Sequence, residues 1–316
     1  MFSLLGGIFL GWSLGANDAA NVFGTAVSSK MLKFWTAAVL ASVFVIIGAL
    51  VSGQAGIDTL KGLTSFNLEQ AVISSVAAAL TVTIMTAFGL PVSTSQAVVG
   101  AILGIGFLNN QLNIAGLGKV VSCWVATPIG AAIIAFFLYR WLGSFYNRAN
   151  LNLFESDALL RLSLILAGIY GAYTLGANNV ANVTAVFVGA GLISVFGAAL
   201  IGGVSIALGI MTYSRPVMET VGKKLVRLDP FSALIVVLSL AVSVHIFTFI
   251  GVPVSTSQGV IGAVLGIGVI KGGNTINRGT LLNILIGWLL TPVLACLCAL
   301  IIFFLFHLYY IPPNYA

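Results

Sequence analysis

Long apolar stretches recur along the whole chain and leave few ways for it to fold. They cover residues 2–27, 34–52, 71–90 and 120–139, and then residues 162–212, 231–269 and 281–308. A helix needs about 17 to 25 mostly apolar residues to cross a bilayer. A chain that is 59% hydrophobic and only 6% charged cannot bury so much apolar surface in a water-soluble core. We therefore predict an all-α, polytopic membrane protein.

The sequence repeats itself about halfway along. GANDAANVFGTAV begins at Gly15 and GANNVANVTAVFV at Gly176, an offset of 176 − 15 = 161 positions. The run PVSTSQ occurs unchanged in both halves, and WVATP in the first half is matched by WLLTP in the second. Matches in one order at nearly one offset indicate a duplication. We predict a first membrane repeat over residues 1–150 and a second over residues 151–316.

The basic residues predict how the two repeats are oriented in the membrane. If each STSQ segment adds one net crossing, each repeat crosses the membrane an odd number of times. Eleven Lys and Arg residues then lie on the cytoplasmic side and two lie outside. If the segment dips in and returns, the division is eight to five. Because Lys and Arg in short loops stay cytoplasmic, the first arrangement is preferred. It predicts two inverted repeats in a plasma or inner membrane, with the central linker cytoplasmic and both termini outside.

Inverted repeats with broken or re-entrant helices at the midplane are typical of secondary transporters. Each PVSTSQ run begins with a proline, which suits the first turn of a helix. The hydroxyl residues that follow would lie at a helix N-terminus, where free N–H groups and about half a positive charge attract anions. Packing is an alternative role for one such triplet, but an identical six-residue run in both halves favours binding. The predicted oxyanion ligands are Ser93, Thr94, Ser95, Gln96, Ser255, Thr256, Ser257 and Gln258.

GANDAAN and its copy GANNVAN are expected to interrupt their helices. Asp18 is the only charged residue inside the apolar stretches, and the second copy has Asn179 in its place. A carboxylate within a membrane is costly and indicates a functional site. Amide and carboxylate oxygens on an interrupted helix are suitable sodium ligands. The predicted sodium ligands are Asn17, Asp18, Asn21, Asn178, Asn179 and Asn182, and Asp18 is a phosphate-binding candidate as well.

The distribution of charge predicts a co-transported cation. No charged residue lies between Glu69 and Lys119 or between Arg161 and Arg215. A divalent oxyanion beside Asp18 would therefore face only about one positive charge, from two helix ends. Sodium is preferred over protons as the cation, because amide oxygens coordinate sodium and cannot relay protons. Asp18 can accept the proton of hydrogen phosphate but would repel sulfate, which favours phosphate.

The two signature copies and the doubled PVSTSQ resemble those of the inorganic phosphate transporter (PiT) family. The similarity covers both halves and implies a phosphate importer driven by sodium or protons. It also implies that Asp18 and the asparagines bind cation and phosphate, and that both STSQ runs hold phosphate. Three departures are Asn179 where many members have Asp, Val45 where some have Glu, and a short central linker. Because related proteins carry sulfate, a proton-coupled phosphate permease or a sulfate permease stays an alternative.

Two other classes of protein fit the sequence less well. An intramembrane serine hydrolase would need His245 as the base for a serine of the second run. The first run has no corresponding histidine, so we expect no enzyme. A passive anion channel is disfavoured because basic residues usually line such pores. We expect a lipid bilayer around the chain, no nucleic-acid partner and no cofactor beyond co-transported sodium, and we leave open a homodimer.

Overall fold

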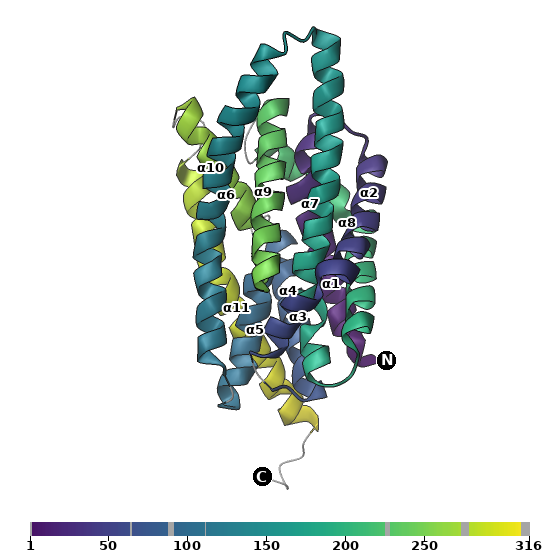
Figure 1. The fold of residues 1–316 in the computed structure, drawn as a ribbon. Coiled ribbons are helices and arrows are strands. Elements are labelled where there is room, and N and C mark those ends of the chain that lie inside the picture. Colours follow the sequence, from purple (N-terminus) through teal and green to yellow (C-terminus); the bar gives the residue numbers. More distant parts are fainter. Residues whose placement is uncertain are drawn as a thin grey trace.

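The computed structural model describes residues 2–63, 65–87, 92–110, 112–224, 228–272 and 278–310. Within these ranges the chain is helical and has no β-strand, which confirms the predicted all-α class. The elements are η1 (Phe2–Leu4), α1 (Leu5–Ser28), α2 (Phe34–Ser52), α3 (Gln54–Lys61), α4 (Leu68–Ala87), α5 (Thr94–Leu108), α6 (Ile114–Arg148), α7 (Leu153–Gly189), α8 (Val195–Lys224), α9 (Pro230–Ile250), α10 (Thr256–Lys271) and α11 (Arg278–Tyr310). In Figure 1 the start of α1 and the end of α11 lie toward one end of the bundle, and the α6–α7 connection lies at the other.

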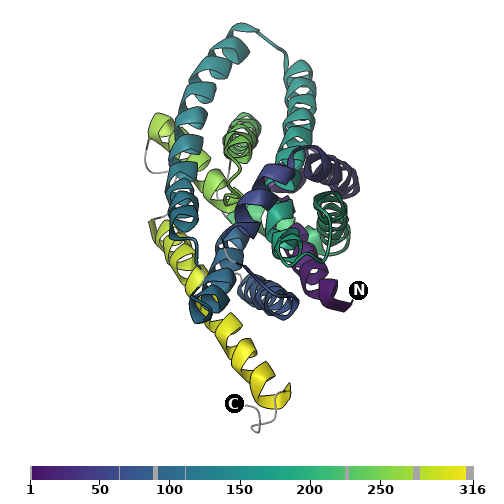
Figure 2. The same cartoon turned by 60° about the horizontal axis from the view of Figure 1, so that its bottom comes forward.

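Seven of the described helices are long and apolar enough to cross a membrane, namely α2, α4, α6, α7, α8, α9 and α11. The protein is therefore a multi-pass membrane protein, as predicted. The apolar stretch 162–212 forms two helices, and so does 231–269. Helix α3 was not predicted, because its eight residues include polar ones and are too few for a span. Helices α6 and α7 exceed their predicted stretches and form an arch beyond the bundle (Figure 2).

The expected interruption at GANDAAN and GANNVAN is wrong, because α1 and α7 run unbroken through these segments. Their glycines serve close packing instead. A Cβ atom on Gly15 would lie 2.0 Å from the carbonyl oxygen of Ile206 in α8. A Cβ on Gly176 would lie equally close, 2.0 Å, to the carbonyl oxygen of Val45 in α2. Only glycine permits so close an approach of two helix backbones.

The two predicted repeats are intertwined. Helix α1 packs along α8, and α7 packs along α2. Helices α1 and α7 run antiparallel, because Gly7 near the start of α1 meets Phe187 near the end of α7, whereas Phe23 meets Gly168. Glycines that follow the two PVSTSQ runs also lie against the other half: Gly100 against Pro292 of α11, and Gly262 against Pro128 of α6. The core is therefore built mainly from contacts between the halves.

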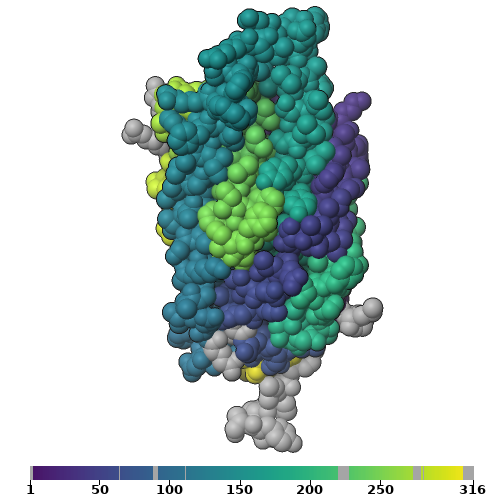
Figure 3. Space-filling view, in the orientation of Figure 1, coloured from purple at the N-terminus to yellow at the C-terminus, as the bar shows by residue number. Residues whose placement is uncertain are grey.

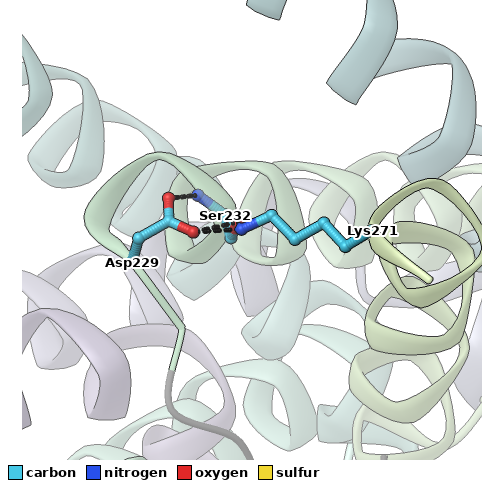
Figure 4. Close-up of polar contacts among 3 residues, drawn as sticks. All are labelled: Asp229, Ser232 and Lys271. Carbon is cyan, nitrogen blue, oxygen red and sulfur yellow. Dashed lines mark hydrogen bonds and ion pairs between the residues drawn. The ribbon is translucent and has the colours of Figure 1, made fainter. Parts of the chain in front are cut away.

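Helices α9 and α10 form a hairpin whose two open ends are joined by an ion pair (Figure 4). The Asp229 carboxylate caps α9 by accepting the backbone N–H of Ser232 at 2.9 Å, and it pairs with Lys271 at the end of α10. Lys271 also donates to the Ser232 hydroxyl at 2.8 Å. Burial alone would raise the pKa of the Asp229 carboxyl, but hydrogen bonds from Lys271 and Ser232 hold it below its ordinary value. The chain thus returns to the end of the bundle at which α9 began.

Helices α4 and α5 form the corresponding hairpin in the first half. Asn113, which follows α5, donates its backbone N–H to the carbonyl oxygen of Leu63 at 2.9 Å and its side-chain amide to Gly62 at 3.2 Å. Because Gly62 and Leu63 precede α4, both ends of this hairpin lie together. Each STSQ segment therefore carries the chain back to the side on which α4 or α9 began. On the face shown in Figure 3, α9 reaches the surface between α6 and α7.

Candidate functional site

The two STSQ segments lie at the N-termini of α5 and α10, which confirms the predicted placement of their hydroxyl residues. Ser93 caps α5 by accepting the backbone N–H of Gln96 at 3.4 Å, and Ser255 caps α10 through Gln258 at 3.3 Å. The prediction that proline starts the helix is wrong for the second copy, because α10 begins three residues after Pro253. The serine cap sets the start, and the residues before it are extended. Pro91 lies outside the described residues.

The two segments exchange hydrogen bonds reciprocally. The Ser95 hydroxyl donates to the carbonyl oxygen of Val254 at 3.0 Å, and the Ser257 hydroxyl donates to that of Val92 at 3.1 Å. The Asn178 side chain also holds Val254: its amide nitrogen donates to the Val254 carbonyl at 2.8 Å, and its oxygen accepts the Val254 N–H at 3.0 Å. The structure thus brings the two halves of the predicted site together.

The asparagines of α7 form a buried cluster against the first motif. Asn182 donates to the Ser95 hydroxyl and to the side-chain oxygen of Asn179, both at 2.9 Å. The side-chain nitrogen of Asn178 donates to the same Asn179 oxygen at 3.4 Å. All three asparagines are 1% exposed. One helix face therefore presents amide groups to both motifs, which a continuous helix achieves because residues 178 and 182 are one turn apart.

The polar residues of α1 contact the second motif. Asn21 donates to the Thr256 hydroxyl at 3.0 Å, and Asn17 donates to the Asp18 carboxylate at 3.0 Å. The Asp18 carboxylate lies near the Thr256 hydroxyl, and Asp18 is 3% exposed. None of the ion pairs among the described residues includes Asp18. A carboxylate buried without a cationic partner is costly, so it needs a bound cation or a proton.

Several polar atoms at this junction are buried and have no hydrogen-bond partner among the described residues. Two are donors, the Thr94 hydroxyl and the Asn179 amide nitrogen. Three are acceptors, the side-chain oxygens of Gln96, Asn182 and Gln258. Because buried polar groups normally have partners, so many at one place indicate a ligand site. The donors suit an oxyanion, and the Asn182 oxygen suits a cation such as sodium.

The contacts of His245 do not support the hydrolase alternative. Its Nδ1 atom lies 2.7 Å from the Tyr170 hydroxyl, and its ring stacks on Phe249. Ser255 instead pairs with Ser257, with 2.9 Å between the two hydroxyl oxygens. His245 thus links α9 to α7, as a hydrogen-bonded histidine in the helix bundle.

The main-chain carbonyl groups of Val92 and Val254 belong to the site and were missed by the sequence interpretation. Both are in the repeated PVSTSQ run, which signals the segment but not which of its atoms accept a hydrogen bond. A second missed contact joins the Ser13 hydroxyl of α1 to that of Thr83 of α4 at 3.0 Å. It holds α1 against the first hairpin.

Comparison with known proteins identifies the family. The model of the phosphate transporter family matches residues 14–299. A candidate phosphate permease of Methanocaldococcus jannaschii is 32% identical over 93% of both chains. The sulfate permease CysP of Bacillus subtilis is 29% identical over 93% of this chain and 84% of its own length.

A solved structure described as the sodium-dependent phosphate transporter matches with a TM-score of 0.84. It is 26% identical to this chain, and the match covers 97% of this chain and 98% of the other. The expectation of no enzyme is confirmed, because the family and this structural neighbour are transporters. The chain belongs to the phosphate transporter family.

Proposed function

We propose that this protein imports inorganic phosphate together with sodium. One observation carries the proposal: unpaired buried donors and acceptors lie together where the motifs of both halves meet. The donors would hold phosphate at the N-termini of α5 and α10, with help from the other STSQ side chains. The Asn182 side-chain oxygen, Asp18 and the other asparagines of α1 and α7 would hold sodium, which offsets the negative charge of the anion. The likeness to a sodium-dependent phosphate transporter supports this assignment.

Asp18 favours phosphate over sulfate as the anion. Its carboxylate is buried beside Thr256 at the start of α10, so a bound oxyanion would lie close to it. Hydrogen phosphate can donate its remaining proton to this carboxylate, whereas sulfate has no proton to donate and would be repelled. A missing hydrogen bond in a buried polar site discriminates strongly between similar ligands.

We further propose that two inverted repeats carry out alternating access. The antiparallel pairing of the equivalent helices α1 and α7 supports inversion, as do two hairpins that open toward opposite ends of the bundle. The exposure of the side chains supports a candidate site that is accessible from one side. Asn17, Asn21 and Ser257 are half-buried, whereas Ser95 and Asn178 are buried. The distribution of Lys and Arg supports a cytoplasmic linker and outside termini.

Sulfate transport is the second candidate, and the similarity to a sulfate permease favours it. Asn179, which stands where the first half has Asp18, leaves the site with one carboxylate and so lowers the repulsion of sulfate. Coupling to protons through Asp18 is the alternative to sodium. A homodimer stays a prediction.

Equilibrium binding to the purified protein tests this proposal. Phosphate at 100 times its Kd should raise the free energy of unfolding by about 2.7 kcal/mol, and only when sodium is present. Thermal unfolding in detergent measures the change, with potassium in place of sodium and sulfate in place of phosphate as controls. Stabilisation by sulfate alone would favour the second candidate, and stabilisation by phosphate without sodium would contradict the coupling.

A further inference from the structure

Two tryptophans at equivalent positions of the halves have unpaired indole nitrogens. Trp124 begins WVATP in α6, and Trp288 begins WLLTP in α11. Both Nε1 atoms are buried without a hydrogen-bond partner among the described residues. By contrast, Trp12 donates its indole N–H to the Thr212 hydroxyl at 2.8 Å. A buried indole N–H usually finds a partner, so the same unpaired donor in both halves needs a reason.

The register between α5 and α11 places Trp288 level with Gln96 of the first motif. A Cβ atom on Gly100 would lie 2.2 Å from the carbonyl oxygen of Pro292, and one on Gly104 would lie 2.8 Å from that of Cys296. Both helices advance by four residues between these contacts, so they run parallel. One turn earlier on the same faces lie Gln96 and Trp288.

Helices α10 and α6 repeat this arrangement. A Cβ atom on Gly262 would lie 2.1 Å from the carbonyl oxygen of Pro128, and one on Gly266 would lie 2.2 Å from that of Ala132. One turn earlier, on the facing sides of the two helices, lie Gln258 and Trp124. The side-chain oxygens of Gln96 and Gln258 are themselves buried and unpaired. Each half thus supplies an indole donor in register with an unpaired amide oxygen of the other half.

We propose that Trp288 orients Gln96 and that Trp124 orients Gln258 when the anion binds. An indole N–H can only donate, so it can pair only with the amide oxygen of the glutamine. This pairing turns the amide NH2 group toward the N-terminus of the motif helix, where it donates to the oxyanion. The two tryptophans are positioning residues that make each glutamine present a donor. The inference rests on the proposed phosphate transport.

Double-mutant cycles on phosphate uptake test the pairing. Trp288→Phe keeps an aromatic ring and removes the donor, so it should raise the KM for phosphate about fivefold, the loss expected for one net hydrogen bond. In a Gln96→Leu background the same substitution should change KM no further, because its partner is already gone. In a Gln258→Leu background it should again raise KM about fivefold. Trp124→Phe should raise KM in the Gln96→Leu background and change it no further in the Gln258→Leu background.

The control is Trp12→Phe, which removes an indole hydrogen bond on α1 that has no part in the motifs. It should leave the KM for phosphate unchanged. An unchanged KM in folded Trp288→Phe protein, or an equal effect in both glutamine backgrounds, would overturn the pairing. If wild-type protein neither binds nor accumulates phosphate, the proposed function fails instead.

Fluorine NMR covers the case in which these variants do not fold. The chain has five tryptophans, and 5-fluorotryptophan labelling gives each its own resonance. Trp12→Phe, Trp35→Phe and Trp141→Phe assign the three tryptophans that lie outside the WVATP and WLLTP segments. Saturation with phosphate in sodium should shift the two remaining resonances and leave those three in place. Phosphate binding that shifts neither of the two would overturn the proposal.

Discussion

The Ser95 hydroxyl of the first half donates to the Val254 carbonyl of the second half across 3.0 Å. Its counterpart, the Ser257 hydroxyl, donates to Val92 at 3.1 Å. A hydroxyl has one hydrogen, so a serine that donates to phosphate must release this carbonyl. The two segments are therefore joined to each other when no anion competes, and anion binding is expected to alter contacts in both halves at once.

Replacing either serine should weaken phosphate binding. We expect Ser95→Ala and Ser257→Ala each to raise the KM for phosphate by a factor that corresponds to about 1.5–3 kcal/mol, since each loses a hydrogen bond to a charged ligand. Concentration-dependent uptake measures this. The matched control is Ser239→Ala, a buried serine of α9 with no hydrogen-bond partner among the described side chains. Wild-type affinity in both motif variants would remove the case for a shared site.

Asp18→Asn should weaken the dependence on sodium more than the affinity for phosphate. The substitution keeps the size of the side chain and removes the charge that would hold the cation. Uptake at varied sodium and fixed phosphate, and then the reverse, separates the two effects. Asn179→Asp is the matched variant in the second half and should increase the dependence on sodium. Unchanged sodium dependence in Asp18→Asn would show that Asp18 does not bind the cation.

Gly100→Ala and Gly262→Ala should destabilise the fold. Each new methyl group would lie 2.2 Å and 2.1 Å, respectively, from a proline carbonyl oxygen. The two helix backbones would have to move apart to relieve this overlap. Overpacking of this kind costs about 1–3 kcal/mol. Thermal unfolding in detergent should show lower midpoints than for Gly118→Ala, whose added methyl meets no atom within 4 Å. Equal midpoints for all three variants would contradict the close helix approach.

That the two PVSTSQ segments meet was predictable because the run is repeated in the sequence, whereas the hydrogen bonds between them were not. Nothing in the sequence marks the Val254 carbonyl as an acceptor, since every residue carries one. GANDAAN was expected to break a helix because its polar residues lie in an apolar stretch. Helix α1 is instead continuous there, and Gly15 allows its close contact with Ile206. Trp288 stood out as a repeat, but its relation to Gln96 depends on helix register, which sequence periodicity does not provide.

The Asp229–Lys271 pair predicts a stability effect with a defined pH range. Asp229→Ala should lower the free energy of unfolding by about 1 kcal/mol at pH 7, mostly through the lost helix cap because both side chains are partly exposed. The pKa of Asp229 is lowered from 3.8, so its contribution is present above pH 3.8 and is lost as the pH falls below that value.

Thermal unfolding of the wild type and of Asp229→Ala as a function of pH checks this prediction. The two stabilities should differ by a constant amount from pH 5 to pH 8 and converge in acid. Asp157→Ala, which breaks an exposed pair with Arg161, is the control and should have a smaller effect. A difference that vanishes between pH 5 and pH 8 would contradict the role of Asp229.

Uptake of labelled phosphate into proteoliposomes tests the central claim most directly. The protein is given a sodium gradient, a proton gradient or no gradient, each with and without excess sulfate. We predict accumulation that is driven by the sodium gradient, is not blocked by sulfate and is lost in Asp18→Asn. Accumulation driven by the proton gradient alone, or abolished by sulfate, would contradict sodium-coupled phosphate transport.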